Sequence, residues 1–402
     1  MSTLQGTAGE GAVSDRSAGS AGRAASTDER GEQLSILRVA ADLYPAVTGG
    51  FPIHAHAMSK RQAEQGHDVT VLTADHGTDG EALSAERPYS VVSHRQLACP
   101  LGNSITPGIV LSLRRRLPAV DVVHAHSHLY FQTNVAAAMA RLSDVPLVLT
   151  NHGLMSQTAP AWLQKLYIPT VGQFTFDAAD RVLCYTETDR QRLRERNIDA
   201  PIDVVNNGVN CERFAPTAAA TKCQLLYVGR LTDGKGIPTL LEGFAMLANT
   251  EPDLTLRIVG DGPDRPRYER RCERLGIADR VTFEGTVPNH ELPRYYSESL
   301  LFVLPSHNEG LPRTVLEALA CETPVVTSDL AQLESVVDGV GYTFERGSPT
   351  AMANTVGRLL ESEDTRHRFG QRGRERVLRE NAWTETVDET TDILTAVASA
   401  SR

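Results

Sequence analysis

Strand-like apolar runs alternate with helical patterns twice along this chain, and this rhythm is the feature that most limits its fold. Each run is short and rich in Val, Ile and Leu, whereas segments between them, such as HAHAMSKRQAEQG at 54–66, have helical periodicity. Strands that alternate with helices pair in parallel, so the pattern predicts an α/β fold with two doubly wound sheets. The predicted strands are 35–45, 67–75, 120–127, 145–152 and 181–187, then 223–231, 254–262, 280–287, 300–306 and 324–329.

The length and the local composition divide the chain further. At 402 residues it exceeds what one core usually holds, and the pattern breaks between 200 and 216. The first 34 residues are rich in Ala, Gly, Ser and Thr and lack an apolar run, so we expect a disordered tail rather than a signal peptide. The sequence therefore predicts a tail at 1–34, domains at 35–205 and 206–375, and a terminal helical segment at 376–402.

Net charge, hydropathy and cysteine usage indicate which partners and which location to expect. A net charge of -10 disfavours nucleic acid, which needs a basic face. No stretch reaches the roughly 18 apolar residues of a membrane-spanning helix. The six cysteines are scattered without C-x-x-C spacing, which is typical of reduced core thiols in a cytoplasmic protein. We expect a cytoplasmic location, with peripheral contact at the inner face of the cell membrane left open.

Two glutamates stand out in PSHNEGLPRTVLEALACETPVVTSD. Glu309 falls in a Gly/Pro loop, and Glu317 is expected about two turns into a helix that Pro312 can open. Such a helix start offers free amides to a phosphate and carboxylates to vicinal hydroxyls, as on a ribose or hexose. By itself the pair fits two solvated helix-end acids equally well.

The segment QLLYVGRLTDGKGIPTLLEGFAML, some eighty residues upstream, supplies two cations. It reads as a strand, a glycine-bearing loop and an amphipathic helix, with Arg230 after the strand and Lys235 between two glycines. Both cations are therefore expected at the C-terminal edge of a parallel sheet, where open α/β folds bind ligands. One such cation alone would be an ordinary surface residue, but the pair favours a diphosphate site.

An ordered set of motifs resembles the retaining glycosyltransferases of the GT-B fold, family 4. The resemblance spans roughly residues 36–345 and implies two Rossmann-like domains facing across a cleft, an N-terminal acceptor domain and a C-terminal donor domain. It further implies a last helix that packs back on the N-terminal domain, and transfer of a hexosyl unit from a nucleotide-diphosphate sugar to a hydroxyl acceptor, lipid-linked or a glycan. No cofactor or metal is implied. The motifs are TGGFPIHAHAM, DVVHAHSH, TNHG, VVNNGVNCERF, VGRLTDGKG, IVGDGP, VTFEGTV and the Glu309 to Glu317 block.

The resemblance also implies roles in donor binding. Arg230, Lys235 and the helix start after Gly310 would stabilise the leaving diphosphate, while Glu309 would hold sugar hydroxyls and Glu317 the ribose diol. IVGDGP has Arg265 where a third glycine would complete a dinucleotide fingerprint, so a nicotinamide cofactor is not expected. The predicted donor-binding set is Gly49, Gly50, Arg230, Lys235, Val287, Glu309, Gly310, Leu311 and Glu317, with Val287 as a main-chain contact to the base.

Three histidines in VVHAHSH are two residues apart, and strand alternation predicts that all three face one side. Zinc is disfavoured because no cysteine or further histidine motif accompanies them. By resemblance, His126 lies near the anomeric carbon and joins Arg230, Lys235 and Glu309 as the catalytic set. His128 and, from TNHG, His152 are predicted on the acceptor side, although a core or surface role fits His128 equally well.

Other readings remain open. An epimerase of nucleotide sugars with the GT-B fold, or a noncatalytic partner subunit, would share this architecture. The base, the sugar and the acceptor are not encoded in the motifs. ITPGIVLSLRRRLPAV at 105–120 could be a basic amphipathic helix that rests on anionic lipid, or an ordinary surface helix.

Overall fold

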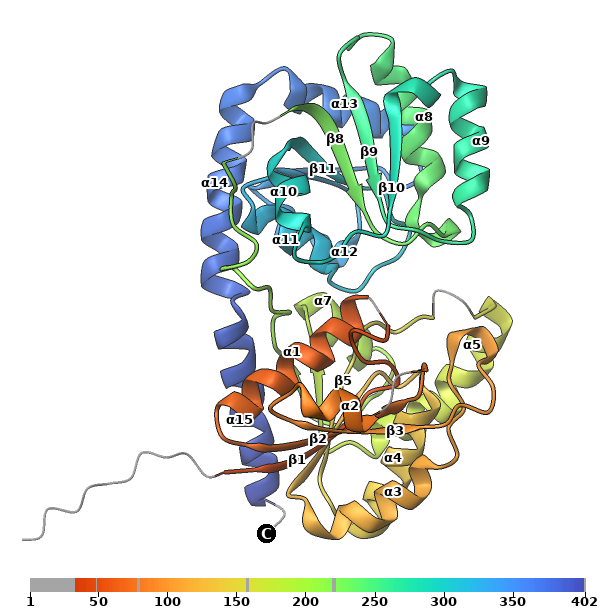
Figure 1. Cartoon of the computed structure of the whole chain (residues 1–402), viewed down its shortest axis with the longest axis vertical. Coiled ribbons are helices and arrows are strands. Elements are labelled where there is room, and N and C mark those ends of the chain that lie inside the picture. The colour runs from red at the N-terminus through yellow and green to blue at the C-terminus, as the bar shows by residue number, and fades with distance from the viewer. Residues whose placement is uncertain (1–32, 48, 78–79, 157–158, 219–221, 401–402) are drawn as a thin grey trace, which may run out of the picture. The chain divides into compact units, whose positions relative to one another are not determined.

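The computed structural model describes residues 33–47, 49–77, 80–156, 159–218 and 222–400. Within these residues the strands form two sheets with the orders β3-β2-β1-β4-β5-β6-β7 and β10-β9-β8-β11-β12-β13, and all neighbouring strands pair in parallel (Figure 1). This confirms the predicted α/β class with two doubly wound sheets. The strands are β1 (Ser35–Val39), β2 (Asp68–Ala74), β3 (Ser90–His94), β4 (Val122–His126), β5 (Leu147–Thr150), β6 (Arg181–Cys184), β7 (Ile202–Val204), β8 (Lys222–Val228), β9 (Thr255–Val259), β10 (Val281–Gly285), β11 (Ser299–Leu304), β12 (Val325–Ser328) and β13 (Gly341–Phe344).

Helices cover both faces of the first sheet. One face packs against helices that include α3 (Ile109–Arg116) and α4 (Phe131–Ser143), where Leu113 and Ala136 share a core with the sheet. The other face packs against helices that include α1 (Gly50–Glu64), through Ala55. Apolar faces on both sides of a parallel sheet explain why β4 and β5 are buried at every position. The remaining elements of this half are α2 (Gly80–Ala85), η1 (Pro100–Gly102), η2 (Leu117–Ala119) and α7 (Glu187–Arg194).

One continuous helical stretch between β5 and β6 contains a change of winding. It consists of α5 (Ala161–Tyr167), the π-helical η3 (Ile168–Gly172) and α6 (Gln173–Asp177). Pro169 has no backbone N–H to donate, so the regular α-helical ladder cannot continue through it. The wider π turn shifts the residues after η3 by one position around the helix.

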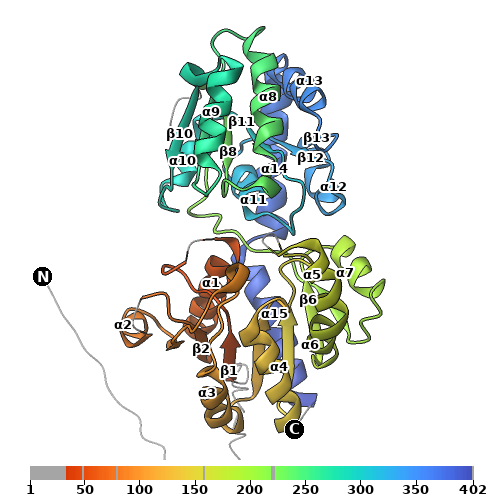
Figure 2. The same ribbon diagram turned by 90° about the vertical axis from the view of Figure 1, so that its right-hand side faces the viewer.

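The second sheet has one core of its own. Leu226, Phe244, Phe302 and Leu316 are among its fully buried residues. Figure 2 shows helices on both sides of this sheet. The elements are η4 (Asp233–Lys235), α8 (Ile237–Ala248), α9 (Arg265–Leu275), η5 (Ala278–Arg280), α10 (Leu292–Ser297), α11 (Arg313–Ala320), α12 (Ala331–Val337), α13 (Pro349–Leu360) and α14 (Glu363–Glu380).

The last helix, α15 (Trp383–Ala400), returns to the first sheet. Leu394 joins the core that contains Ala55, and Gln62 Nε2 donates to Thr391 Oγ1 at 2.9 Å. Residues 381–382 separate α14 from α15. The boundary expected at 376 therefore lies inside α14, a helix that packs against α11 of the second half. In the part of the chain that the structure describes, no helix is long and apolar enough to cross a membrane.

All six cysteines lie in described segments and are free thiols. Cys184, Cys272 and Cys321 are buried, but Cys99 and Cys223 are exposed. The expectation that these are core thiols is therefore wrong for the last two, because Cys223 lies at the exposed start of β8 and Cys99 lies in the loop before η1.

Candidate active site

The loops that follow β8 and β11 meet at the C-terminal edge of the second sheet. Gly236 has φ +66°, and a Cβ placed there would lie 2.0 Å from the Pro305 carbonyl oxygen. Only glycine allows this close approach of two backbones. The His307 amide also donates to the Gly234 carbonyl oxygen at 2.9 Å. These contacts bring the GKG segment against the loop that carries Glu309.

Lys235 and Glu309, predicted from separate motifs, form an ion pair. Lys235 Nζ lies 2.6 Å from Glu309 Oε1, and Ser306 Oγ donates to the same oxygen at 2.7 Å. Their side chains are 14% and 7% exposed. Gln332 Nε2, on α12, donates to the Glu309 carbonyl oxygen and so fixes the backbone of the loop. A cation and a carboxylate are thus fixed side by side at a sheet edge, where one could bind phosphate and the other a hydroxyl.

Glu317 lies deeper in the fold. Helix α11 begins at Arg313, so Glu317 is about one turn into it, and the expectation of two turns is wrong. Tyr296 Oη donates to Glu317 Oε2 at 3.1 Å, and Arg313 Nε lies 3.8 Å from Oε1. Burial raises the pKa of the Glu317 carboxyl, while Arg313 and the Tyr296 hydrogen bond oppose that rise. The carboxylate is therefore held by internal partners at the base of α11.

Arg313 connects Glu317 to the first half of the chain. Its guanidinium lies over the Trp383 ring at 5.5 Å, and a Cβ on Gly50 would lie 3.7 Å from Arg313 Cδ. The side chain is buried, and this burial lowers the pKa of the Arg313 guanidinium. Arg313 was not among the predicted residues, although its place directly after Pro312 in the glutamate block was a usable signal.

The three histidines of VVHAHSH do not face one side. His124 and His126 have ring centroids 4.5 Å apart, whereas the His128 ring packs against Phe176 at 4.6 Å. Strand β4 ends at His126, and Ser127 has φ +61°, which breaks the alternation. His128 is fully buried against Phe176, which fits the core role that the sequence left open for it rather than the acceptor-side one.

Buried imidazoles form a hydrogen-bonded chain behind the sheet edge. His126 Nδ1 lies 3.0 Å from His152 Nε2, and Tyr185 Oη lies 2.8 Å from His152 Nδ1. His54 Nδ1 lies 3.5 Å from the same hydroxyl. Burial lowers the pKa of His152 to about 3 and holds the pKa values of His54 and His126 well below the usual range. The imidazoles are therefore neutral, and each can donate from one nitrogen and accept at the other.

The chain of imidazoles extends toward the glutamate block. His54 Nδ1 lies 3.2 Å from Asn207 Oδ1, and Asn207 Nδ2 donates to the Leu311 carbonyl oxygen at 3.4 Å. His54 and Tyr185 were missed in the sequence. Tyr185 directly follows β6, as His152 closely follows β5, so the rule that strand ends carry site residues could have found it.

A cavity of about 490 Å³ joins residues predicted for donor and acceptor. His152 borders it from the loop after β5, and Glu309 and Gly310 border it from the second half. A Cβ on Gly310 would lie 2.9 Å from the His152 carbonyl oxygen, so a larger residue would push these segments apart. The other lining residues are Gly153, Leu154, Met155, Asp189, Arg192, Glu195, Arg196 and Asn308.

The remaining predicted residues differ in how far they are exposed. Arg230 is exposed. Burial raises the pKa of the nearby Asp42 carboxyl, and His76 and, to a smaller extent, Arg230 oppose that rise. Gly49 is the N-cap of α1 and has no side chain with which to cap the first amides of that helix. Val287 is half-buried and packs on the second core. Leu311 is buried.

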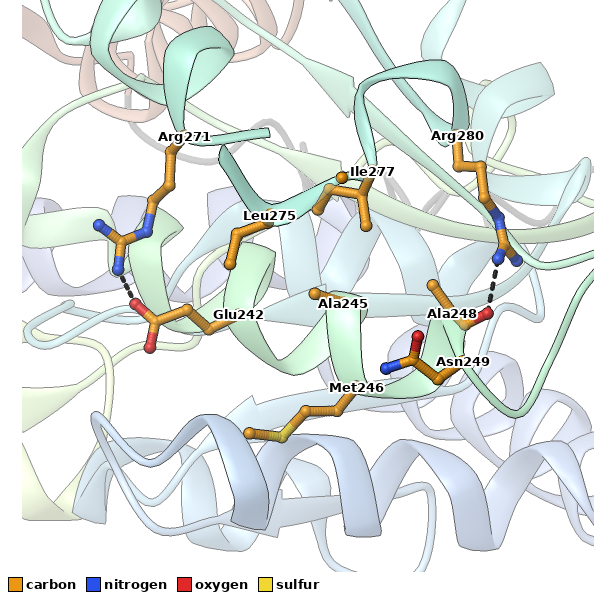
Figure 3. Close-up of a pocket in the computed structure, with 10 residues that line it drawn as sticks. Glu242, Ala245, Met246, Ala248, Asn249, Arg271, Leu275, Ile277 and Arg280 are labelled. Atoms are coloured by element: carbon orange, nitrogen blue, oxygen red, sulfur yellow. Dashed lines mark hydrogen bonds and ion pairs between the residues drawn. The ribbon is translucent and has the colours of Figure 1, made fainter. Parts of the chain in front are cut away.

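A second cavity, of about 450 Å³, lies between α8 and α9 and is lined by no predicted residue (Figure 3). Arg271 pairs there with Glu242, and Arg280 donates to the Ala248 carbonyl oxygen at 2.7 Å. Arg271 neutralises the Glu242 carboxylate, and Arg280 binds a free carbonyl group at the C-terminal end of α8. Both are structural roles. Across the described residues, no group of three or more His, Cys, Asp or Glu side chains is placed to hold a metal ion.

Two family models and several curated proteins match this chain over most of its length. Residues 48–213 match the family described as Glycosyltransferase Family 4, and residues 210–376 match the Glycosyl transferases group 1. A D-inositol 3-phosphate glycosyltransferase from Frankia alni is 33% identical over 378 residues, covering 80% of this chain and 88% of that protein. The chain belongs to the group 1, family 4 glycosyltransferases. A glycogen synthase from Mycobacterium tuberculosis is 26% identical over 400 residues, covering 92% and 96% of the two chains.

Solved structures confirm the GT-B fold of this family 4 glycosyltransferase. Sucrose-phosphate synthase from Thermosynechococcus elongatus superposes with a TM-score of 0.74 at 22% identity, over 92% of this chain and all of that one. The Anabaena HepE protein in complex with UDP and glucose superposes with a TM-score of 0.77 at 17% identity, over 90% of this chain and all of that one. At these identities the likeness concerns the fold alone.

Proposed function

We propose that this glycosyltransferase moves a hexosyl unit from a nucleotide-diphosphate sugar to a hydroxyl acceptor, with retention of the anomeric configuration. One observation carries the proposal: the cavity bordered by Glu309, Gly310 and His152, beside the Lys235–Glu309 ion pair. The Anabaena structure with UDP and glucose supports a nucleotide-sugar donor. The D-inositol 3-phosphate glycosyltransferases support a hydroxyl-bearing acceptor.

The proposed roles follow from charge and from hydrogen-bonding capacity. As the bond from the anomeric carbon to the diphosphate breaks, negative charge grows on the phosphate, and Lys235 and exposed Arg230 stabilise it. Glu309 accepts hydrogen bonds from sugar hydroxyls once Lys235 turns to the phosphate. The acceptor oxygen attacks the face that the diphosphate leaves, and its proton passes to a phosphate oxygen. No side-chain base and no protein-bound metal take part in this scheme.

His126 is the proposed contact to the donor sugar. Its Nδ1 is engaged by His152, while its Nε2 is buried without a hydrogen-bond partner among the described residues. A buried nitrogen of this kind gains from a new partner, because leaving it unpaired costs free energy. The Phe51 ring lies 6.0 Å from the His126 ring, so Phe51 would move as the sugar enters. Glu317 binds the ribose diol in the same proposal, which requires it to exchange Tyr296 or Arg313 for the ligand.

Turnover of nucleotide sugars tests this function. We expect release of a nucleoside diphosphate from one sugar nucleotide in the presence of acceptor, with NMR of the product showing the anomeric configuration of the donor. Arg230→Ala should lower kcat about a hundredfold or more, as loss of a charge that stabilises a leaving group does. Arg267→Ala is the matched control, because Arg267 is an exposed cation that pairs with Asp233 nearby. An inverted product, an epimerised sugar nucleotide formed without acceptor, or equal loss in both variants would contradict the proposal.

A further inference from the structure

Exposed apolar side chains gather on one part of the first half of the molecule. Among the residues that the structure describes, twelve large apolar side chains are exposed, and ten of them fall between residues 97 and 174. This segment lies between β3 and β6 and includes β4 and β5, and its helices α3, α4 and α6 pack on one face of the first sheet. A concentration of exposed apolar side chains on one part of a protein indicates an interaction surface, whereas single exposed apolar side chains do not. The ten are Leu97, Leu101, Val110, Leu111, Leu142, Met155, Trp162, Leu166, Val171 and Phe174.

Four of these side chains follow one another along the α5–η3–α6 stretch. Trp162 and Leu166 are 69% and 62% exposed, and Val171 and Phe174 are 41% and 42% exposed. Their spacings are four, five and three residues, and the five-residue step crosses the π turn η3. Because a π turn takes in one extra residue, this step keeps Val171 in line with Trp162 and Leu166. We call these four residues the apolar stripe.

The surroundings of the stripe are basic in an otherwise acidic protein. Residues 95–177, up to the end of α6, contain six cations and three anions, a net charge of +3, whereas the whole chain carries -10. One of the anions, Asp121, is turned inward, because its Oδ2 accepts from the Ser35 amide at 2.8 Å. The cations are Arg95, Arg114, Arg115, Arg116, Arg141 and Lys165, and the other anions are Asp144 and Asp177.

Helix α3 belongs to the same face of the sheet. It buries Ile109 and Leu113 and exposes Val110 and Leu111. Helix α4 lies between α3 and α6 and packs against both (Figure 2). The basic end of α3, with Arg114 and Arg115 exposed, therefore lies on the side of the sheet that carries the stripe.

The stripe is connected to the candidate active site. Met155 lines the cavity that holds His152 and Glu309, and it is itself 40% exposed. The next residue, Ser156, is tied to α5, because Gln164 Nε2 donates to its carbonyl oxygen at 3.0 Å and Gln164 Oε1 accepts from its amide at 2.8 Å. Two hydrogen bonds therefore join the edge of the cavity to the helix on which the stripe begins.

We propose that the apolar stripe, together with the basic end of α3 on the same face of the sheet, docks this glycosyltransferase on the surface of an anionic lipid bilayer. Tryptophan and leucine on one side of a helix enter the headgroup boundary, and nearby cations are attracted to anionic lipids. The rest of the chain carries -13, so the same bilayer repels it and orients the molecule with the stripe inward. Docked in this way, the cavity opens beside the lipid surface, where the head group of a lipid-linked acceptor can reach it.

Vesicle sedimentation without nucleotide tests the docking, and its result does not depend on the proposed reaction. The full-length protein should sediment with vesicles of phosphatidylcholine and phosphatidylglycerol at low salt, and much less with phosphatidylcholine alone or at high salt. The double variant Trp162→Gln, Leu166→Gln should bind at least about tenfold more weakly. Arg114→Gln with Arg115→Gln should lose only the part of binding that depends on anionic lipid.

The matched control is the double variant Met246→Gln, Leu378→Gln, in which both replaced side chains are 45% exposed in the second half of the chain. It should bind vesicles as the wild type does, and unchanged thermal unfolding shows that each variant is folded. The proposal is overturned if the wild type stays in the supernatant with anionic vesicles, or if control and stripe variants lose binding equally. It is also overturned if light scattering shows a dimer that the stripe variant splits, because the stripe would then be a contact between two copies.

Discussion

At the scale of single residues, the Lys235–Glu309 pair sets the chemistry of the site. Each group is held against an opposite charge at 2.6 Å, so neither is an isolated charge at the sheet edge. A donor that offers a phosphate to the lysine and hydroxyls to the glutamate replaces both partners at once. The pair therefore favours a ligand that carries both groups over a simple anion or a simple sugar.

The sequence predicted Lys235 and Glu309 as site residues, but it did not predict that they pair with each other. Each lies in a motif with glycines, but the two loops meet through the close approach of Gly236 to Pro305, which are far apart in the sequence. Arg313 and His54 depend on contacts between segments far apart in the chain, such as the stacking on Trp383. His128 was misplaced because one left-handed residue, Ser127, reverses the side on which it falls. No periodicity rule anticipates a single such residue.

Buried histidines make the stability of the protein depend on pH. Burial lowers the pKa of His128 to about 3, below its value in the unfolded chain. The folded state therefore binds fewer protons, so its stability is full above about pH 6.5 and falls as the pH drops toward the folded pKa. At pH 5, His128 alone should remove about 2 kcal/mol from the free energy of unfolding.

The variant His128→Phe, measured by urea unfolding between about pH 5 and 7.5, tests this. Phenylalanine can pack on Phe176 and does not titrate, so its stability should fall less steeply with acid than that of the wild type. The difference in slope is the readout, because the substitution also changes packing. Identical slopes would show that His128 does not titrate differently in the folded protein.

At the scale of elements, central strands were easier to predict than edge strands. The sequence reading missed β3, β7 and β13, each of which lies at an edge of its sheet. Edge strands pack on fewer neighbours, so their apolar runs are shorter, as in Ile202–Val204. The π turn η3 was not predicted either. Pro169 indicates that the α-helical hydrogen bonding is interrupted, but it does not indicate that a π turn replaces it.

The packing of α15 makes a prediction about one glycine. A Cβ on Gly208 would lie 2.7 Å from two atoms of the Trp383 ring, at the start of α15. Gly208→Ala should therefore force the ring aside and lower the free energy of unfolding by about 1–3 kcal/mol. Gly357→Ala is the control, since its Cβ would make only an ordinary contact at 3.9 Å inside α13.

Chemical denaturation of both variants gives the comparison. We expect a clear loss for Gly208→Ala and no loss, or a small gain from better helix propensity, for Gly357→Ala. If Gly208→Ala were as stable as the wild type, the close approach of Gly208 to Trp383 would not matter for the attachment of α15.

At the scale of the whole molecule, side-chain hydrogen bonds between α7 and α12 link the two halves. Thr188 Oγ1 lies 3.4 Å from the Ala331 carbonyl oxygen, and Arg192 donates to Gln332 Oε1 at 3.2 Å. These bonds are at the long end of the usual range, so they hold the halves weakly. Gln332 also donates to the Glu309 carbonyl oxygen, which connects this contact to the donor loop.

Donor binding should therefore tighten the contact between α7 and α12. In hydrogen–deuterium exchange, we expect the amides of α12 and of residues 308–312 to exchange more slowly when a donor nucleotide is present. Helix α13, which packs on α8, is the internal reference and should not change. Protection that is equal with and without nucleotide would mean that the halves do not close over the donor.

Calorimetric titration with UDP, GDP and ADP tests the central claim most directly. One nucleotide should bind the wild type, and Lys235→Ala should weaken it at least about tenfold, or about 1.4 kcal/mol. Lys222→Ala is the matched control, because Lys222 also pairs with a glutamate, Glu298 at 2.7 Å, but at the start of β8. It should bind as the wild type does. If no nucleotide bound, or if Lys235→Ala bound as tightly as Lys222→Ala, the donor site would not lie at the Lys235–Glu309 pair.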